Sequence, residues 1–315
     1  MSLPRLPAVR DIIKLYGLSA RSQLSQNFIL DKNITDKIVR TTAMNAKTPL
    51  VLEVGPGPGL LTRSILDADA RNVVAVEKDD RFISALKQLA ESSGDRLKVL
   101  QGNMLTIPDE EILSAAKLGP ANPMDSTDPI HIIGNLPFNV ASPLLIQWLH
   151  KLAGRQGLFG LGDASVWMTL MFQKEVGQRL SAEVSTQHRG RLAVMTQSLC
   201  QVKTVYTVPS TVFVPQPKVD ASVVQLVPKP AFHIGDTAGV YLTLENILRY
   251  FFTKRRKTVG HILNRLSKEM PRAKEAIAEA EVGLDKKARP EDISTDQFCQ
   301  MAMIFHRQNI VDLPL

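Results

Sequence analysis

Short apolar runs alternate with amphipathic segments along the first 230 residues of the chain. The runs are rich in Val, Ile and Leu and end at glycine or at a polar residue, which is typical of buried strands. They predict strands at 50–54, 72–77, 97–100, 130–133, 165–171, 202–208 and 219–227. The segments between them have helical periodicity and predict helices at 7–18, 34–43, 60–66, 80–90, 108–119, 141–152, 173–180 and 191–200.

Strands that alternate with helices predict an α/β fold built on a doubly wound sheet. The last two predicted strands are separated by a loop that contains three prolines, and we expect them to form an antiparallel edge. From about Leu242 helical periodicity dominates to the end of the chain. We therefore expect two domains, one at 1–228 with a helical and loop extension at its start, and a small helical one at 229–315.

Each of the first four predicted strands is followed by a residue that could contact a ligand. Gly55 follows the first strand, Glu77 ends the second, Asn103 follows the third and Asn135 follows the fourth. Ligands of doubly wound sheets bind at the carboxyl ends of the strands. The four positions together therefore predict one binding site at that edge of the sheet.

The turn after the first strand contains Gly55, Gly57 and Gly59. Glycine lets the backbone approach a bound nucleotide closely, because no Cβ stands in the way. A dinucleotide fingerprint has two residues between its second and third glycines, which would place the third at Leu60. The spacing therefore disfavours NAD, while Glu77 is placed to accept hydrogen bonds from both hydroxyls of a ribose.

The tetrapeptide Asn135-Leu136-Pro137-Phe138 carries the candidate chemistry. An adenine amino nitrogen is a poor nucleophile because its lone pair is delocalised into the ring. The Asn135 side chain and the Leu136 carbonyl could accept its two N–H bonds and so favour a localised lone pair. Pro137 adds no competing N–H, and Phe138 offers a ring for stacking. With the glycine turn, this tetrapeptide indicates methyl transfer from S-adenosylmethionine to an exocyclic amine.

The chain carries a net charge of +7, and its placement indicates a nucleic-acid partner. Residues 241–290 hold twelve basic and six acidic residues, and residues 1–50 hold eight basic and three acidic ones. The basic run of Lys254, Arg255, Arg256 and Lys257 follows two phenylalanines. We expect this run to contact RNA phosphates, although basic clusters also occur on ordinary solvated surfaces.

Several common kinds of site are not expected. Cys200 and Cys299 are too few for a disulfide framework or a zinc site, and the six histidines lack ligand-like spacing, so we expect no metal. No apolar run approaches the ~20 residues of a membrane span. Residues 1–10 have no acidic side chain and contain Arg5 and Arg10, which is compatible with the remnant of an organelle transit signal.

Seven short segments occur in an order that resembles one known family. They are Leu24–Asp31 (LSQNFILD), Glu53–Gly59 (EVGPGPG), Asn135–Phe138 (NLPF), Phe172–Val176 (FQKEV), Phe213–Asp220 (FVPQPKVD), Arg255–Lys257 (RRK) and Arg289–Glu291 (RPE). They resemble the small-subunit rRNA adenine N6,N6-dimethyltransferases, and most closely the mitochondrial branch of that family. The match extends over most of the chain.

The resemblance implies a fold, a cofactor and a set of contacts. The fold would be a seven-stranded Rossmann-like methyltransferase sheet followed by a small helical domain that binds RNA. The cofactor would be S-adenosylmethionine, bound by Asn27, Ile29, Gly55, Gly57, Glu77, Lys78, Asn103, Met104 and Asn135. Phe138 and Phe213 would bracket the target adenine. The family usually has Asp at the position of Asn103, so that contact would lose a charge.

The resemblance also implies a substrate and partners. The substrate would be two adjacent adenosines in a hairpin loop near the 3′ end of mitochondrial small-subunit rRNA, each of which would receive two methyl groups. Unpaired bases cost less to extrude into a pocket than paired ones. The protein would be a monomer of the mitochondrial matrix that acts on the small ribosomal subunit, with the mitochondrial transcription machinery as a further partner.

Three alternatives stay open at this point. The chain could be a non-catalytic RNA-binding factor in mitochondrial ribosome assembly or transcription, but such a factor needs neither Glu77 nor the Asn135 tetrapeptide. It could act on large-subunit rRNA, as antibiotic-resistance methylases do. An NAD enzyme is disfavoured by the glycine spacing.

Overall fold

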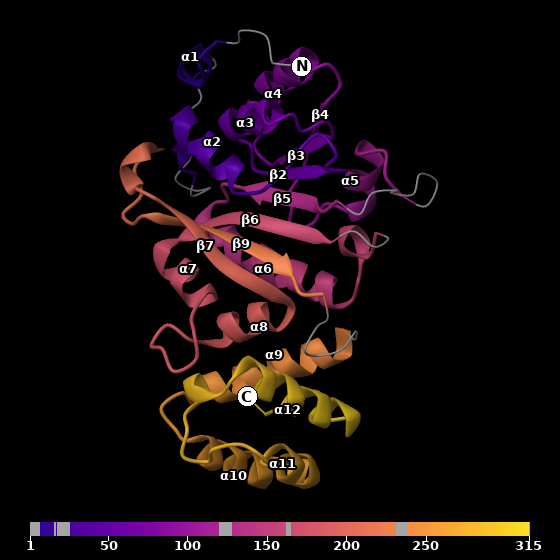
Figure 1. Ribbon diagram of the computed structural model, residues 1–315, viewed down its shortest axis with the longest axis vertical. Helices are drawn as coiled ribbons and strands as arrows, with labels where there is room; N and C mark the ends of the chain where they lie inside the picture. The colour runs from indigo at the N-terminus through magenta and orange to yellow at the C-terminus, as the bar shows by residue number, and fades with distance from the viewer. Residues whose placement is uncertain are drawn as a thin grey trace. The chain divides into compact units, whose positions relative to one another are not determined.

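The structure is a computed structural model that describes residues 7–15, 17, 26–119, 128–161, 165–230 and 238–314. The chain divides into two compact units whose segments interleave (Figure 1). The first consists of Met1–Gln147, Gly157–Gly177 and Lys203–Val227, and the second of Trp148–Gln156, Gln178–Val202 and Pro228–Leu315. The last segment of the second unit begins at Pro228, one residue before the predicted second domain at 229–315, and two earlier segments also belong to that unit.

A seven-stranded sheet has the strand order β4-β3-β2-β5-β6-β9-β7. Its strands are β2 (Val51–Val54), β3 (Val73–Glu77), β4 (Leu97–Gln101), β5 (Ile130–Gly134), β6 (Val166–Gln173), β7 (Cys200–Val208) and β9 (Ala221–Pro228). The pairs β3–β4, β2–β3, β2–β5 and β5–β6 are parallel, and β6–β9 is antiparallel. The predicted α/β class and the seven-stranded Rossmann-like sheet are therefore confirmed.

Helices connect these strands and continue to the end of the chain (Figure 1). They are α1 (Val9–Leu15), α2 (Lys32–Arg40), α3 (Leu60–Asp67), α4 (Asp80–Ser92), α5 (Asp109–Ala115), α6 (Phe138–Ala153), α7 (Lys174–Leu180), α8 (Arg191–Leu199), α9 (Ala238–Thr253), α10 (Val259–Glu269), α11 (Lys274–Ala280) and α12 (Thr295–Arg307). Short 3₁₀ turns lie at Gly157–Gly160, Ser210–Val212, Pro271–Ala273 and Pro290–Asp292.

Several helix starts differ from the prediction, and two of the differences have a clear cause. Helix α2 begins at Lys32 rather than 34, because Asp31 caps it: its carboxylate accepts a hydrogen bond from the Asn33 backbone N–H at 2.9 Å. Helix α6 begins at Phe138 rather than 141, since the Pro137 carbonyl already accepts hydrogen bonds from the next turn. The tetrapeptide after β5 therefore leads directly into a helix.

A small second sheet forms where the sequence predicted loops. Strand β1 (Phe28–Ile29) pairs antiparallel with β8 (Phe213–Val214), so that Ile29 lies opposite Phe213. No periodicity is visible in a two-residue strand, and the pairing joins segments far apart in the sequence. It brings the Leu24–Asp31 motif beside the Phe213–Asp220 motif.

The core of the first unit is the parallel part of the sheet. Every residue of β2, β3 and β5 is buried, as expected for strands covered on both faces. Leu61 and Ile65 of α3 and Leu89 of α4 pack in the same cluster as strand residues. Because the strands cannot shift within this core, the turns at their carboxyl ends are held in fixed positions.

The second unit is helical apart from the strand ends that enter it. Helix α9 lies beside α12, and α10 beside α11 (Figure 1). A capping box joins Ser294 and Gln297 at the start of α12. Buried Arg189 donates hydrogen bonds to the Gln197 side chain at 3.1 Å and to the Ile293 carbonyl at 3.2 Å. This arginine ties the segment before α8 to the start of α12.

Some predictions concern residues outside the described ranges, or features that those ranges lack. The residues outside the described ranges include residues 1–6 with Arg5, the motif residues Leu24 and Ser25, and residues 120–127 between the predicted helix at 108–119 and the predicted strand at 130–133. Within those ranges, no helix is long and apolar enough to cross a bilayer, and no cluster of His, Cys, Asp and Glu could hold a metal ion. Cys200 and Cys299 are both buried and free.

A buried histidine in β5 makes the stability of the first unit sensitive to pH. His131 is 1% exposed, and its ring lies edge-on to Trp167 at a centroid distance of 5.8 Å. Neither ring nitrogen has a hydrogen-bond partner among the described residues. Burial disfavours the charged ring and lowers the pKa of His131 from 6.5 to about 4.

Replacing His131 by Phe should remove this pH sensitivity. The unfolded chain binds a proton at His131 below pH 6.5 while the folded chain does not until about pH 4, so stability is lost as the pH falls through that window. Between pH 7 and pH 5 the parental protein should lose about 2 kcal/mol of unfolding free energy relative to His131→Phe. Urea unfolding at both pH values measures the difference. The control His261→Phe changes an exposed histidine and should lose as much stability as the parent. If all three proteins lose the same unfolding free energy between pH 7 and pH 5, His131 is not the source of the pH sensitivity.

Candidate active site

The candidate site lies where the strand order reverses. Strand β2 has β3 on one side and β5 on the other, so the chain leaves the two central strands in opposite directions. Such a switch point opens a crevice at the carboxyl ends of the strands. Gly55 follows β2 and Asn135 follows β5, so the predicted cofactor turn and the predicted catalytic tetrapeptide leave adjacent strands.

The backbones of β2 and β5 approach each other too closely at this point for a side chain to lie between them. A Cβ atom on Gly134 would lie 2.7 Å from the Val54 carbonyl oxygen. Only glycine fits such a position, since no shift of a flexible side chain could relieve a contact with backbone. Gly134 therefore allows Asn135 to approach the glycine turn.

The glycine turn uses backbone conformations that favour glycine. Gly55, Gly57 and Gly59 have φ values of 67°, 53° and 84°, and Gly59 is the N-cap of α3. The Gly57 N–H donates a hydrogen bond to Glu77 Oε2 at 2.9 Å. A Cβ on Gly57 would lie 3.2 Å from the Phe28 ring. The turn is thus packed between the end of β3 and the segment before α2.

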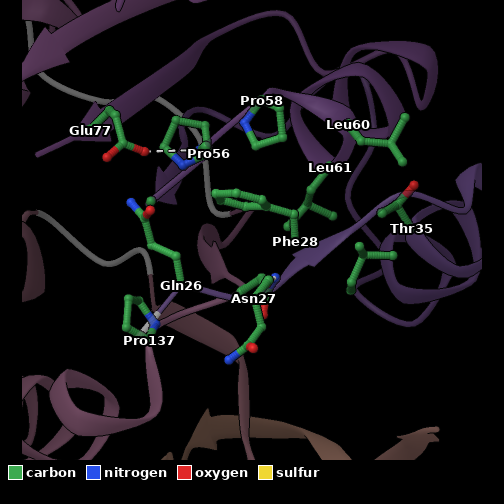
Figure 2. A pocket seen from close by; sticks show the side chains of 14 residues that line it. Gln26, Asn27, Phe28, Thr35, Pro56, Pro58, Leu60, Leu61, Glu77 and Pro137 are labelled. Atoms are coloured by element: carbon green, nitrogen blue, oxygen red, sulfur yellow. Dashed lines mark hydrogen bonds between the residues drawn. The ribbon is translucent and has the colours of Figure 1, made fainter. Parts of the chain in front are cut away.

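Two cavities meet at this turn. One of about 70 Å³ is lined by residues 26–29, the glycine turn, Asn135 and Pro137. The other, of about 200 Å³, is lined by the ends of β3 and β4, including Glu77, Asn103 and Met104. Both are lined by Gln26, Gly55, Glu77 and Pro137. Figure 2 shows the smaller cavity, with Phe28 below Pro58 and with Gln26 between Glu77 and Pro137.

Glu77 is the buried acidic group of both cavities. Its Oε1 accepts a hydrogen bond from the Asp79 backbone N–H at 2.7 Å, while its Oε2 is bound by Gly57. Burial raises the pKa of Glu77 above its usual 4.5, and the backbone hydrogen bonds oppose that shift. Each carboxyl oxygen keeps a second lone pair, so Glu77 can accept two further hydrogen bonds.

Asn135 is held in one orientation by the main chain. Its Nδ2 donates a hydrogen bond to the Asn27 carbonyl oxygen at 2.8 Å. Only the NH₂ end of an amide can donate to a carbonyl, so this contact fixes which end of the side chain is which. Oδ1, the acceptor that the sequence analysis assigned to the target amine, therefore points away from Asn27.

The aromatic residues predicted to bracket an adenine pack in the apolar core of this structure. Phe213 is 2% exposed and belongs to the main apolar cluster, and half-buried Phe138 packs against the same cluster. Leu136 and Pro137 line the larger cavity, whereas neither Phe138 nor Phe213 is among the described residues that line the two cavities. The bracketing role of the two phenylalanines stays a prediction.

The remaining predicted cofactor contacts gather around the two cavities. Ile29 lines the smaller one, and Lys78, Asn103 and Met104 line the larger one. Asn103 Oδ1 accepts a hydrogen bond from the Leu105 backbone N–H at 3.2 Å, which fixes its amide. All nine predicted cofactor residues therefore lie at the strand-end site or on the segment that covers it.

Sequence reasoning missed three residues of this site. Gln26 lines both cavities, Phe28 packs on the glycine turn, and Asp79 binds Gln26 and Arg81 through its carboxylate. The sequence signal for Gln26 and Phe28 is their place on either side of Asn27 in the Leu24–Asp31 motif. The sequence around Asp79 indicates only a helix cap, and in the structure Asp79 does cap α4.

The basic run of the second unit is divided by its contacts. Lys254 Nζ lies 3.5 Å from the centre of the Tyr250 ring, and Arg255 binds the Gln187 carbonyl at 2.8 Å and Glu291 at 3.5 Å. Arg256 and Lys257 are exposed. The four residues predicted to bind RNA are therefore not equivalent, since only the last two have side chains directed mainly to solvent.

The chain is similar to known proteins over nearly all of its length. The family described as ribosomal RNA adenine dimethylase matches residues 17–307. Proteins named "Dimethyladenosine transferase 1, mitochondrial" from Vermamoeba vermiformis and Homo sapiens are each 40% identical to it, over 98% and 97% of this chain and 96% and 86% of theirs. The protein of that name from Xenopus tropicalis is 42% identical over 96% of this chain and 86% of its own.

Solved structures agree. A dimethyladenosine transferase from Plasmodium falciparum has a TM-score of 0.66 at 25% identity, over 89% of this chain and 98% of that one. The 23S rRNA methyltransferase ErmE has a TM-score of 0.60 at 22% identity, over 89% of this chain and 99% of that one, and shares the fold. The chain belongs to the ribosomal RNA adenine dimethylase family, whose members are rRNA adenine dimethyltransferases that use S-adenosylmethionine.

Proposed function

We propose that the protein transfers two methyl groups to N6 of each of two adjacent adenosines in a 3′-terminal hairpin loop of mitochondrial small-subunit rRNA. The observation that carries this proposal is the orientation of Asn135. Its amide nitrogen is bound to the Asn27 carbonyl, which leaves the amide oxygen to accept an N–H from a target amine. Asn135 also lines the cavity next to the glycine turn, where a methyl donor would lie.

The residues present fit S-adenosylmethionine. The larger cavity has Glu77 for ribose hydroxyls, Asn103 for a base edge and buried Met104 for a ring face. The smaller cavity is bounded by the glycine turn, whose Gly57 has no room for a larger side chain beside Phe28. We therefore assign the adenosine part of the donor to the larger cavity and its methionine part to the smaller one.

The chain contributes mainly orientation to the reaction. S-adenosylmethionine supplies an electrophilic methyl group when it is bound. Asn135 Oδ1 and the Leu136 carbonyl accept the two N–H bonds of the adenine amine and so localise its lone pair toward the donor cavity. The ammonium group that forms when the nitrogen accepts the methyl group is acidic enough to lose a proton to water, so no buried general base is needed. Holding the reacting atoms in line then accounts for most of the rate.

The second unit, and residues 229–315 in particular, is proposed to bind rRNA through its backbone phosphates. Exposed Arg256 and Lys257 supply positive charge that the folded chain does not neutralise by a described contact. We propose a monomer of the mitochondrial matrix, in line with the mitochondrial names of its relatives. A contact with the mitochondrial transcription machinery stays a prediction from the family resemblance.

Donor binding should depend on the Glu77 carboxylate. Glu77→Gln keeps the size of the side chain but puts an NH₂ where one backbone N–H or ribose hydroxyl needs an acceptor. Donor affinity should fall by about 2 kcal/mol, the scale of a lost charge-assisted hydrogen bond. Calorimetry with S-adenosylmethionine measures this. The control Asp80→Asn removes a charge from a nearby exposed residue and should bind S-adenosylmethionine with parental affinity. An equal loss of affinity in both variants would show a general effect of charge rather than a contact to Glu77.

Catalysis should depend on Asn135 more than RNA binding does. Asn135→Ala removes an acceptor that acts in the transition state, and the rate of dimethylation should fall about a hundredfold or more. RNA affinity should change little, because phosphate contacts dominate it. Labelled-methyl incorporation into a small-subunit rRNA fragment and filter binding measure the two quantities. Asn33→Ala, on the exposed face of α2, is the matched control, and a parental rate in Asn135→Ala would refute the mechanism.

RNA affinity should lose part of its salt dependence when Arg256 and Lys257 are both changed to Gln. Each lost single-strand phosphate contact lowers the slope of log affinity against log salt by ~0.7, so the pair should lower it by up to ~1.4. The control pair Arg272→Gln with Lys274→Gln removes the same charge from other exposed positions of the second unit. If the control lowers the slope as much, the basic run has no special role.

A further inference from the structure

The segment Gln26–Ile29, here called the strap, is attached to the site at four successive residues. Gln26 Nε2 donates a hydrogen bond to Asp79 Oδ2 at 3.1 Å. The Asn27 carbonyl accepts from Asn135 Nδ2 at 2.8 Å. The Phe28 ring lies edge-on to Phe82 at 5.4 Å, and Ile29 pairs with Phe213 in the small sheet.

The strap touches both halves of the proposed reaction. All four of its residues line the smaller cavity, and Gln26 lines the larger one as well (Figure 2). Its Asn27 carbonyl sets the orientation of the amide that would hold the target amine. Any movement of the strap would therefore displace a wall of the donor site and the acceptor of the amine at the same time.

Asp79 is the charged anchor of the strap. Its side chain is 1% exposed, and it bonds Arg81 through both carboxyl oxygens at 2.9 and 2.6 Å. The hydrogen bonds from Arg81 lower the pKa of Asp79 to about 2. Its backbone N–H meanwhile binds Glu77 Oε1. One residue thus connects the ribose carboxylate to the strap.

We propose that Asp79 is a positioning residue for methyl transfer, which holds Gln26 and thereby fixes the Asn27 carbonyl that orients the amide of Asn135. The proposal rests on the proposed function for its effect on rate, and on geometry alone for its effect on the strap. Asp79 also lines the larger cavity, but its carboxylate is engaged by Arg81 and Gln26, so its role in this scheme is to position the strap. It acts through Gln26, and the neighbouring peptide transmits the constraint to Asn27.

The first test removes the Gln26–Asp79 hydrogen bond without changing the charge. Gln26→Met keeps the length of the side chain and removes its donor. A small displacement of a positioning contact can lower a rate ~10²-fold, so kcat should fall at least tenfold, while KM for the rRNA fragment stays within about twofold. In the protein without donor, amide hydrogen exchange at 27–29 should accelerate about tenfold, because a tether is lost. The control Gln88→Met, on the exposed face of α4, should match the parent in all three measurements.

The second test restores the hydrogen bond with donor and acceptor exchanged. Gln26→Glu alone places a second carboxylate beside Asp79 with no N–H between them, so the anchor is lost, kcat should fall and exchange at 27–29 should speed up. Adding Asp79→Asn to Gln26→Glu gives an amide at 79 that donates to the new carboxylate at 26. The pair should recover most of kcat and the slow exchange, but not the thermal stability lost with the Arg81 ion pair, and this split excludes a purely structural role.

Two results would overturn the proposal. One is parental kcat and parental exchange in Gln26→Met, and the other is a double variant no better than Gln26→Glu alone. If the parental protein methylates no small-subunit rRNA, the proposed function fails, while the exchange measurements still decide whether Asp79 holds the strap.

Discussion

The close approach of β2 and β5 is the constraint on which the site depends. Their backbones come so near at Val54 and Gly134 that a single Cβ would collide with a carbonyl oxygen. This contact exists because the parallel pair is buried on both faces and cannot splay. It places the glycine turn and the Asn135 tetrapeptide on neighbouring strand ends, where we propose that a methyl donor and a target amine meet. Without this close approach of the two strands, the glycine turn and the Asn135 tetrapeptide would not border the same cavity.

Burial also sets the charge of the site. Glu53, in β2, is fully buried, and neither of its carboxyl oxygens has a hydrogen-bond partner among the described residues. Burial, with a smaller contribution from the Glu77 charge, raises the pKa of Glu53 to about 8, so that it is mostly the neutral acid at pH 7. Glu77 differs because two backbone N–H groups stabilise its charge. The same residue type is thus part of the core in one strand and, in the next, is the group that we propose to accept hydrogen bonds from the ribose.

The strap and Thr35 of α2 are the parts of the described site that come from before β2. The strap is short and has no periodicity, and it is held by contacts to three distant segments, at Asp79, Asn135 and Phe213. Each contact alone is worth little, since a hydrogen bond contributes about 1 kcal/mol. Together they order a segment that local propensity would leave as a loop. The proposed donor cavity, the Asn135 amide and the Phe213 segment therefore all contact one piece of backbone.

The sequence by itself determined the α/β class, the strand-end residues and the family, because strand and helix periods and the order of the motifs are local properties of the chain. It did not determine the cap of α2, the start of α6 or the pairing of β1 with β8. Only the tertiary structure revealed that Arg255 is engaged by Glu291 while Arg256 is exposed, and that Asp79 binds Gln26. The two helix starts rest on local contacts that compete with neighbouring ones, whereas the Arg255–Glu291 and Gln26–Asp79 contacts and the β1–β8 pairing join residues 36, 53 and at least 184 positions apart. Such contacts are decided by how the elements pack, and no local pattern of hydrophobic and polar positions records them.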